Sequence, residues 1–343
     1  MTQAHTRLLA ALFLSACLAL VAPQEAAAAK PTQLTLSYSE KTADFLPVLI
    51  ASDAGYFKKH GLDVTVRYLP AQEGIPALIT GQAQVAGIGG SDAVSAEAEG
   101  TKLKLVLTLT PTYVFQFWAR PQYANAQALK GQRVGITSAT GSLYAGTVVA
   151  LETLGLKPSD VAITPLGSVI NVNNSLLAGS VAAAASHPPA TYRFKRAGLV
   201  DLVDLAKKKI PSVSAGVWVT QYFMRANRST VQNMVDALVE ATQREKSDRA
   251  FAESEMRKYL GVMDQAELDF TYDFYVHEAV PADPAPTAAQ IESNIKALLA
   301  SNPRIASLAV GTMIDQSFVE NAEKAAGTQK SGTVGSGPPR QKR

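Results

Sequence analysis

Beyond residue 30 the chain alternates short apolar runs with longer segments of helical periodicity. Residues 34–38 and 62–68 are strand-like, and the apolar run 46–57 between them ends at a basic, glycine-containing helix stop, residues 58–61. The rhythm continues with expected helices at 74–80 and 91–99 and expected strands at 83–88 and 103–109. Strands that alternate with helices are typical of α/β architecture, so we predict that class.

The same alternation of strand and helix patterns begins again near residue 132, and only helical patterns follow it later in the chain. The second set of expected strands is 132–137, 161–166 and 181–185, and the helices between and after them are 143–154, 170–177 and 190–197. A long strand-like run at 213–223 follows, and beyond it only helical patterns occur, at 229–249, 254–260, 265–274 and 288–301. Two α/β units with a helical finish predict two lobes.

Two extended apolar runs interrupt the rhythm, at 110–118 and 213–223. We place the passages of the chain between the lobes at these runs. Lobe one is then discontinuous, with residues 31–113 plus 221–326, and lobe two is the insert 114–220. Residues 327–343 are rich in Gly, Ser, Pro and basic side chains, which predicts a disordered tail.

The first 29 residues have the pattern of a secretory signal peptide. Arg7 supplies a positive charge, residues 8–22 are small and apolar, and Ala26–Ala29 offer small residues for cleavage. An apolar run of this length is too short to span a bilayer as a mature helix. We therefore expect a periplasmic protein. Cys17 sits in a sequence that resembles a bacterial lipoprotein box, so lipid anchoring at Cys17 remains the alternative.

Composition excludes several classes of protein. Among 343 residues there is one cysteine, which excludes an intramolecular disulfide, a cysteine-rich zinc module and an iron–sulfur cluster. The formal net charge is +3, but residues 330–343 contribute +4 and residues 1–29 contribute none, which leaves about −1 for the body. A nucleic-acid partner is therefore not expected. None of the histidines has another histidine or a cysteine at i+3 or i+4, so we expect no metal and no cofactor.

In open α/β sheets, ligands bind beyond the carboxyl ends of the strands, where loops enter helices. Applied to the expected strands, this rule selects three groups of residues. Lobe one contributes Ser39, Thr42, Asp44, Phe45, Gly90, Ser91 and Asp92. Lobe two contributes Ser138, Thr140, Gly141, Ser142, Ser168 and His187, and the crossing runs contribute Tyr113 and Trp218.

The candidate residues include hydroxyls and glycines at helix starts and no Arg or Lys. A helix N-terminus holds an anion without basic side chains, and residues 138–142 are the best such cradle. Ordinary helix capping is the alternative there and at residues 90–92. If Asp44 lines the pocket, its carboxylate would pair with an amine of the ligand. The alternative is that Asp44 is a solvated acid in a surface loop. The imidazole of His187 can donate one hydrogen bond to a ligand and accept another.

Five segments of the chain resemble, in order, elements of the periplasmic substrate-binding proteins that serve nitrate, sulfonate, taurine and thiamin-precursor ABC importers. They are Asp53-Ala54-Gly55-Tyr56-Phe57 with Gly61-Leu62-Asp63-Val64, Leu78-Ile79-Thr80-Gly81, Leu129-Lys130-Gly131 with Val134, Gly155-Leu156 with Asp160-Val161, and Leu177-Ala178-Gly179-Ser180-Val181. Gln84 and Ala182 stand where the family usually has an acidic residue. The resemblance implies the two-lobe periplasmic binding protein fold of type II, which closes on a small molecule about two hinge crossings.

We therefore expect an extracytoplasmic solute-binding protein that is monomeric and delivers a small anionic or zwitterionic molecule, such as a sulfonate or taurine, to an ABC importer permease. The alternatives are a thiamin-pyrimidine precursor as ligand, a periplasmic sensor role, or an enzyme on the same fold. The sequence contains no Gly-x-Ser-x-Gly elbow, HExxH motif or Walker loop, so no enzymatic activity is expected.

Overall fold

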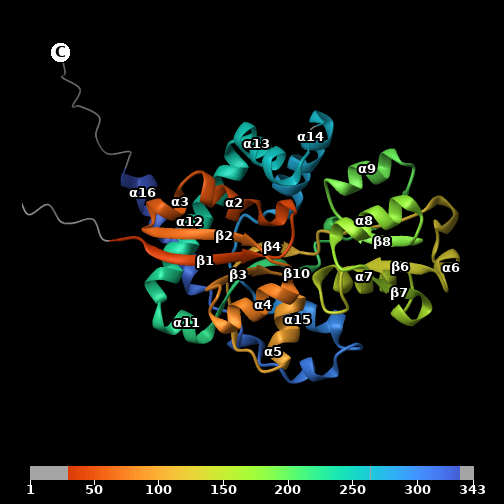
Figure 1. Ribbon diagram of the computed structural model, residues 1–343, viewed down its shortest axis with the longest axis horizontal. Coiled ribbons are helices and arrows are strands. Elements are labelled where there is room, and N and C mark those ends of the chain that lie inside the picture. Colours follow the sequence, from red (N-terminus) through yellow and green to blue (C-terminus); the bar gives the residue numbers. More distant parts are fainter. Residues whose placement is uncertain (1–29, 263, 333–343) are drawn as a thin grey trace, which may run out of the picture. The chain divides into compact units, whose positions relative to one another are not determined.

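The computed structural model describes residues 30–262 and 264–332. The expected signal peptide and residues 333–343 of the expected tail lie outside these residues. Two five-stranded sheets form the framework, with strand orders β2-β1-β3-β10-β4 and β7-β6-β8-β5-β9 (Figure 1). The strands of the first sheet are β1 (Thr32–Tyr38), β2 (Leu62–Tyr68), β3 (Val85–Ile88), β4 (Leu103–Thr112) and β10 (Pro211–Thr220). Those of the second are β5 (Gln116–Ala119), β6 (Arg133–Ile136), β7 (Ala162–Pro165), β8 (Ala183–Ser186) and β9 (Val200–Asp204).

Each sheet combines parallel strands with antiparallel ones. In the first sheet β1 runs parallel to β2 and β3, whereas β10 is antiparallel to β3 and β4. In the second sheet β6 runs parallel to β7 and β8, whereas β5 is antiparallel to β8 and β9. The parallel strands are joined by helices that cross over the sheet. The predicted α/β class is confirmed.

The helices pack on both faces of the sheets. Those up to the end of the second sheet are α2 (Leu46–Asp53), α3 (Tyr56–Lys59), α4 (Ala71–Thr80), α5 (Gly90–Ala98), α6 (Ala126–Leu129), α7 (Ser142–Thr153), α8 (Val169–Ala178), α9 (Ala190–Arg196) and α10 (Leu205–Lys208). The C-terminal ones are α11 (Gln221–Ala226), α12 (Arg228–Ser247), α13 (Arg249–Leu260), α14 (Gln265–Phe274), α15 (Ala288–Leu298) and α16 (Ser317–Gly332). On the first sheet, α2 and α12 cover one face and α4, α5 and α15 the other.

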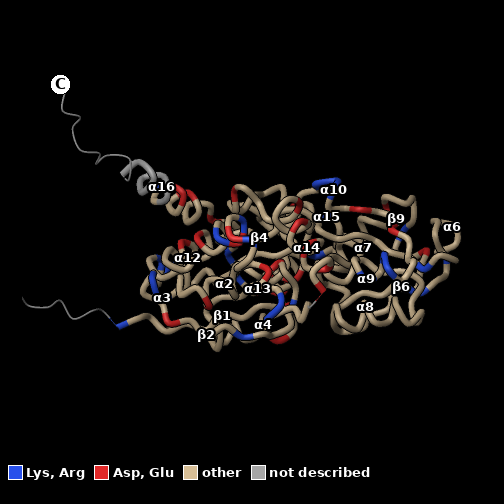
Figure 2. Tube along the Cα trace, turned by 90° about the horizontal axis from the view of Figure 1, so that it is seen from above, with Lys and Arg blue, Asp and Glu red and all other residues tan. Residues whose placement is uncertain are grey.

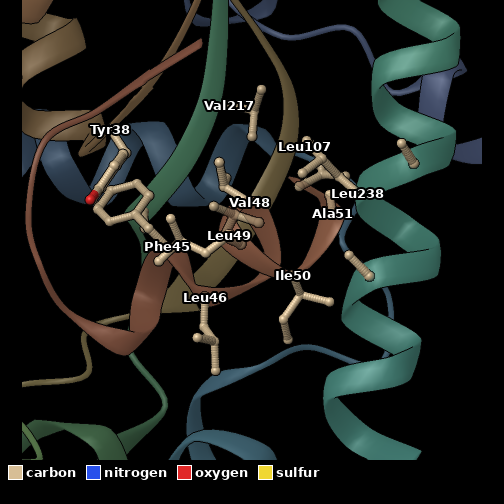
Figure 3. Packing of buried hydrophobic residues seen from close by; sticks show 14 of the residues in the cluster. Tyr38, Phe45, Leu46, Val48, Leu49, Ile50, Ala51, Leu107, Val217 and Leu238 are labelled. Atoms are coloured by element: carbon tan, nitrogen blue, oxygen red, sulfur yellow. The ribbon is translucent and has the colours of Figure 1, made fainter. Parts of the chain in front are cut away.

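Helix α2 is apolar on all sides because it is enclosed between the first sheet and α12. Its residues Leu46–Ala51 are all buried, and they pack with Leu107 of β4, Val217 of β10 and Leu238 of α12 (Figure 3). A helix with no polar face is stable only in such a position. Gly55 adopts a φ of 75° and separates α2 from α3, so the single helix expected over 46–57 is in fact two.

The chain leaves the first sheet after Thr112 and enters the second at Gln116. It returns before β10, which pairs with β3 and β4 of the first sheet. Residues 211–220 therefore lie in the first sheet, whereas the sequence analysis assigned them to lobe two. An extended apolar run looks the same in either sheet, because only strand pairing decides to which sheet it belongs.

Two C-terminal features depart from the sequence pattern. Helix α16 runs to Gly332 and so includes residues 327–332, which were predicted to belong to a disordered tail. Helix α14 continues as a π-helical turn, Tyr275–Ala279, labelled η4. π-helical turns often mark functional sites because they reorient the side chains that follow.

Among the described residues no helix is both long and apolar enough to cross a membrane. Figure 2 shows basic residues scattered over the elements of both sheets and interspersed with acidic ones.

Candidate ligand-binding cleft

Two adjoining cavities lie where loops after the strands of both sheets meet. The outer cavity, of about 60 Å³, is bordered by the loop after β1, the start of α4, the loop after β6 and the start of α8. The inner cavity, of about 10 Å³, lies among Asp44, Phe45, Gly89, Phe115, Ser142, His187 and Ser214. Ser39, Glu40 and Asp92 line both cavities. Residues from both sheets therefore enclose a common cleft, at the place that the strand-end rule selects.

Ten of the fifteen predicted ligand residues line these cavities. The outer cavity is bordered by Ser39, Thr42, Asp92, Ser138, Gly141 and Ser168, and the inner one by Ser39, Asp44, Phe45, Asp92, Ser142 and His187. Gly90, Ser91, Tyr113, Thr140 and Trp218 line neither. These five need a different explanation.

The aromatic pair Tyr113 and Trp218 belongs to the hydrophobic core. Both side chains are fully buried, and the indole Nε1 of Trp218 donates to the carbonyl of Ile88 at 3.2 Å. Trp218 lies in β10, where side chains alternate between the two faces of the sheet and this one points into the core, whereas Tyr113 lies in the segment between β4 and β5. The structure thus places both side chains in the core and not along the two cavities, where the sequence predicted them.

Helix α15 covers the predicted residues at the start of α5. Asn294 of α15 donates through Nδ2 to the hydroxyls of Ser91 and Ser212, both at 3.1 Å. A Cβ added at Gly90 would stand 2.5 Å from Oδ1 of Asn294. Ser91 and Gly90 therefore serve the packing of α5 against α15. Thr140, in the loop before α7, is exposed.

The predicted anion cradle at the start of α7 faces a carboxyl group of this same chain. Helix α7 begins at Ser142 after an N-cap Gly141, without a side-chain capping bond. Oδ1 of Asp92 lies 3.7 Å from the position that a Cβ would take on Gly141. An acidic side chain from α5 thus already lies near the positive end of α7. At the start of α8, Ser168 acts as a helix cap and accepts from the backbone N–H of Asn171 at 3.2 Å.

Sequence reasoning missed several residues of the cleft. Glu40 lines both cavities and directly follows Ser39, which the strand-end rule selects. The same rule could therefore have selected Glu40 as well. Tyr68, at the end of β2, and Ile170, in the first turn of α8, are partly exposed side chains that border the outer cavity. Tyr275 lines neither cavity but contacts Asp44 and His187, and it had no such signal, because the π-helical turn after α14 places it there.

The cleft is acidic. Burial raises the pKa of Glu40 to about 7, with Asp44 and Asp92 adding to the rise and His187 opposing it. Burial likewise raises the pKa of Asp92 to about 7. Among the residues that line the two cavities there is no arginine, and the one lysine, Lys41, lies with Nζ 4.9 Å from the ring centroid of Tyr68. Above neutral pH the carboxylates therefore dominate the electrostatics of the cleft.

A buried hydrogen-bonded bridge connects the two sheets behind the inner cavity. The Tyr275 hydroxyl donates to Oδ2 of Asp44 at 3.0 Å and lies 2.9 Å from Nδ1 of His187. Nδ1 is also 3.1 Å from the carbonyl of Pro188, which can only accept, so Nδ1 carries a hydrogen, while Nε2 lies 3.6 Å from Oδ2 of Asp44. Burial first, and then Asp44, raise the pKa of Tyr275 well above its usual value, so this hydroxyl stays a neutral donor.

Replacement of Tyr275 by phenylalanine removes the centre of this bridge and leaves Asp44 and His187 buried without it. We expect the free energy of unfolding to fall by roughly 1–3 kcal/mol, the range for buried polar groups left unpaired. Urea denaturation at pH 7 measures this change. Tyr272→Phe in α14 is the matched control, because that hydroxyl makes a longer bond of 3.3 Å to the carbonyl of Lys246. Equal losses in the two variants would contradict a special role for the bridge.

Comparisons with known proteins agree with this geometry. Residues 42–248 match the family described as "NMT1/THI5 like". The riboflavin-binding protein RibY of Chloroflexus aurantiacus is 26% identical over 147 residues, which make up 40% of this chain and 42% of that protein, so the match spans less than half of either.

Solved structures of binding proteins are similar in fold. The periplasmic aliphatic sulphonate-binding protein SsuA of Escherichia coli aligns with a TM-score of 0.68 and 18% identity, over 83% of this chain and 92% of that one. The periplasmic nitrate-binding protein NrtA of Synechocystis PCC 6803 aligns with a TM-score of 0.69 and 14% identity, over 86% and 89%. At these identities the likeness concerns the fold. The resemblance inferred from the sequence is confirmed: the chain belongs to the NMT1/THI5-like family and has the two-lobed fold of the periplasmic binding proteins.

Proposed function

We propose that the protein is an extracytoplasmic solute-binding protein that captures a small organic molecule between its lobes and delivers it to an ABC importer permease. The observation that carries this proposal is a polar cleft enclosed by loops of both sheets, in a chain of this family. We further propose that it acts as a binder and not as an enzyme. A monomeric state, with the permease as partner, agrees with this role.

The proposed mechanism is closure of the two lobes around the solute. Ligand sites for drug-sized molecules usually measure about 300–1,000 Å³, and the outer cavity of about 60 Å³ is much smaller. The lobes must therefore separate to admit a solute and close again around it. The solute shifts this equilibrium by as much as it binds the closed form better than the open one. The closed surface is then the form that the permease recognises.

The lining of the cleft favours a solute with N–H donors or a positive charge over a sulfonate without an amino group or the nitrate that the sequence also suggested. Glu40, Asp44 and Asp92 line the cavities, and no arginine does. A sulfonate or nitrate in this cleft would face like charge with no guanidinium to pair with. The thiamin-pyrimidine type of ligand, with its exocyclic amino group, fits this lining better. Riboflavin, the ligand named for RibY, belongs in the same test.

A thermal-shift screen tests the proposal. The exported protein is screened against amines, aminopyrimidines and riboflavin on one side and against nitrate and sulfonates that lack an amino group on the other. Taurine, which carries both an ammonium and a sulfonate group, is screened apart from both groups. A solute at 100 times its Kd is expected to stabilise the protein by about 2.7 kcal/mol. We expect compounds of the first group to stabilise the protein. We also expect these compounds to remain chemically unchanged after prolonged incubation with it. Hits confined to the anions would overturn the ligand preference, and turnover of a hit would show an enzyme.

A second experiment separates transport from sensing. Deletion of the gene in its host is expected to abolish uptake of the radiolabelled hit. Uptake that continues unchanged, together with loss of a transcriptional response to the same solute, would favour the sensor alternative.

A further inference from the structure

The inner cavity is a chamber of the size of a single polar group. Its volume of about 10 Å³ corresponds to roughly one water-sized probe. It adjoins the outer cavity, since Ser39, Glu40 and Asp92 line both. A solute held in the outer cavity can therefore extend one small head group into the chamber.

The chamber offers acceptors that lack partners. Asp44 is 5% exposed, and its Oδ1 makes no hydrogen bond to any described residue, whereas Oδ2 is occupied by Tyr275. Ser142 is 8% exposed, and its Oγ likewise has no hydrogen-bond partner in the described part of the chain. The neighbouring Ser214 hydroxyl is engaged, because it donates to the carbonyl of Thr112 at 2.8 Å. Buried oxygens without partners are unfavourable, and both of these oxygens could accept from a donor placed in the chamber.

We propose that the inner chamber binds the protonated amine of the solute, with Asp44 and Ser142 as its buried acceptors; this inference rests on the proposed function. An ammonium group has three donors and no acceptor. One donor can pair with Oδ1 of Asp44, one with Oγ of Ser142, and the third with a carboxylate of Glu40 or Asp92 at the entrance. The positive charge and the three donors of the ammonium group thus complement the negative charge and the acceptors of the chamber.

Two further observations favour an ammonium over other occupants. Among the described residues no group of three or more His, Cys, Asp or Glu side chains is placed to hold a metal ion. At the mouth of the outer cavity the ring of Tyr68 already accepts a cation, since Nζ of Lys41 lies 4.9 Å from its centroid. The body of the solute would then lie in the outer cavity near Tyr68 and Ile170, whose side chains are 38% and 59% exposed.

Pairs of probes that differ only in the head group test the proposal. Butylamine and benzylamine are compared with butanol and benzyl alcohol, and with benzenesulfonate, by calorimetry and ligand-observed NMR at pH 8. We expect each amine to bind at least 10-fold more tightly than its alcohol, with no binding of the sulfonate. Alcohols that bind as well as amines, or amines that do not bind, would overturn the proposal.

Two variants locate the head group. Ser142→Ala removes an oxygen that makes no bond to the described residues, so folding is expected to be unaffected while amine affinity falls several-fold. Asp44→Asn keeps an acceptor for Tyr275 but removes the charge, and it is expected to reduce the advantage of amine over alcohol at least 10-fold. Asp63→Asn, at an exposed position on β2, is the matched control. Amine binding that is unchanged in Ser142→Ala and Asp44→Asn would contradict a head group in the chamber.

The pH dependence gives an independent readout. The groups that face Glu40 are Asp44, Tyr68, Asp92, His187 and Tyr275. The carboxyls of Glu40 and Asp92 ionise near pH 7, while the probe amines remain protonated from pH 6 to 8. Amine affinity is therefore expected to rise across this range and alcohol affinity to stay level. An amine affinity that is flat or falling would contradict the proposal.

These experiments separate the two proposals. If the screen yields a transported solute without an amine, the solute-binding function stands and the amine chamber fails. If no solute binds and deletion leaves uptake intact, the function itself fails.

Discussion

Replacement of Gly89 by valine is expected to weaken binding of the transported solute by about 100-fold, because it blocks closure of the lobes. Gly89 precedes α5 on the first sheet, and Ser142 begins α7 on the second. A Cβ added at Gly89 would stand 1.8 Å from Oγ and 3.0 Å from Cβ of Ser142, and 3.3 Å from the carbonyl oxygen of Ser214. The backbone of Gly89, with φ −71° and ψ 150°, accepts any side chain, so the effect arises at the contact between lobes.

A graded series makes this prediction sharp. In Gly89→Ala the Ser142 hydroxyl can rotate away, which leaves the close approach of the two Cβ atoms, so the loss is expected to be smaller, about 10-fold. Affinity is measured by calorimetry and compaction on ligand addition by small-angle X-ray scattering. Gly311→Ala, where a Cβ would meet nothing within 4 Å, is the control.

A double variant distinguishes a steric block from other effects. Ser142→Gly in the Gly89→Ala background is expected to bind as well as Ser142→Gly alone, since the clashing atoms are gone. Wild-type affinity in Gly89→Val, or no recovery in the double variant, would contradict closure at this contact.

Replacement of Glu245 by glutamine is expected to stabilise the protein strongly at alkaline pH. Glu245 lies in α12, is fully buried, and neither carboxylate oxygen has a hydrogen-bond partner among the described residues. Burial raises its pKa from 4.5 to about 8, with Asp44 adding to the rise and Lys246 opposing it. In the folded protein this carboxyl therefore keeps its proton through neutral pH.

The sign of the effect follows from the raised pKa. Because the folded state holds the proton more tightly than the unfolded state, Glu245 destabilises the fold progressively as the pH rises from about 4.5 to about 8. The difference in unfolding free energy between Glu245→Gln and wild type is expected to grow across this window, at about 1.4 kcal/mol per pH unit at most and to roughly 5 kcal/mol in all. Glu40 and Asp92 titrate equally in both proteins, so the difference isolates Glu245.

Urea denaturation at pH 5, 7 and 9 measures this difference. Glu99→Gln, at an exposed position after α5, is the control and is expected to follow the wild type at each pH. Stability curves of Glu245→Gln and wild type that run parallel across the range would contradict a buried, protonated Glu245.

Local patterns in the sequence were enough to predict the α/β class and most elements of both sheets. The alternation of residues 62–68, for example, corresponds to β2 at the same bounds. Strand ends also located the cleft, because parallel strands followed by helices always present their loops at one edge of the sheet. Ser39, Asp92, Ser142 and His187, selected in this way, line the two cavities.

The sequence alone also determined the family, through short motifs in a fixed order, and it selected hydroxyls and an acid at the cleft. Only the tertiary structure decided that β10 lies in the first sheet, that Trp218 is core, and that Tyr275 meets Asp44 and His187. It also decided that Asp92 faces the predicted anion cradle. The physical reason is the same in each case: periodicity is a property of neighbouring residues, whereas pairing, burial and charge proximity depend on segments that meet only when the chain folds.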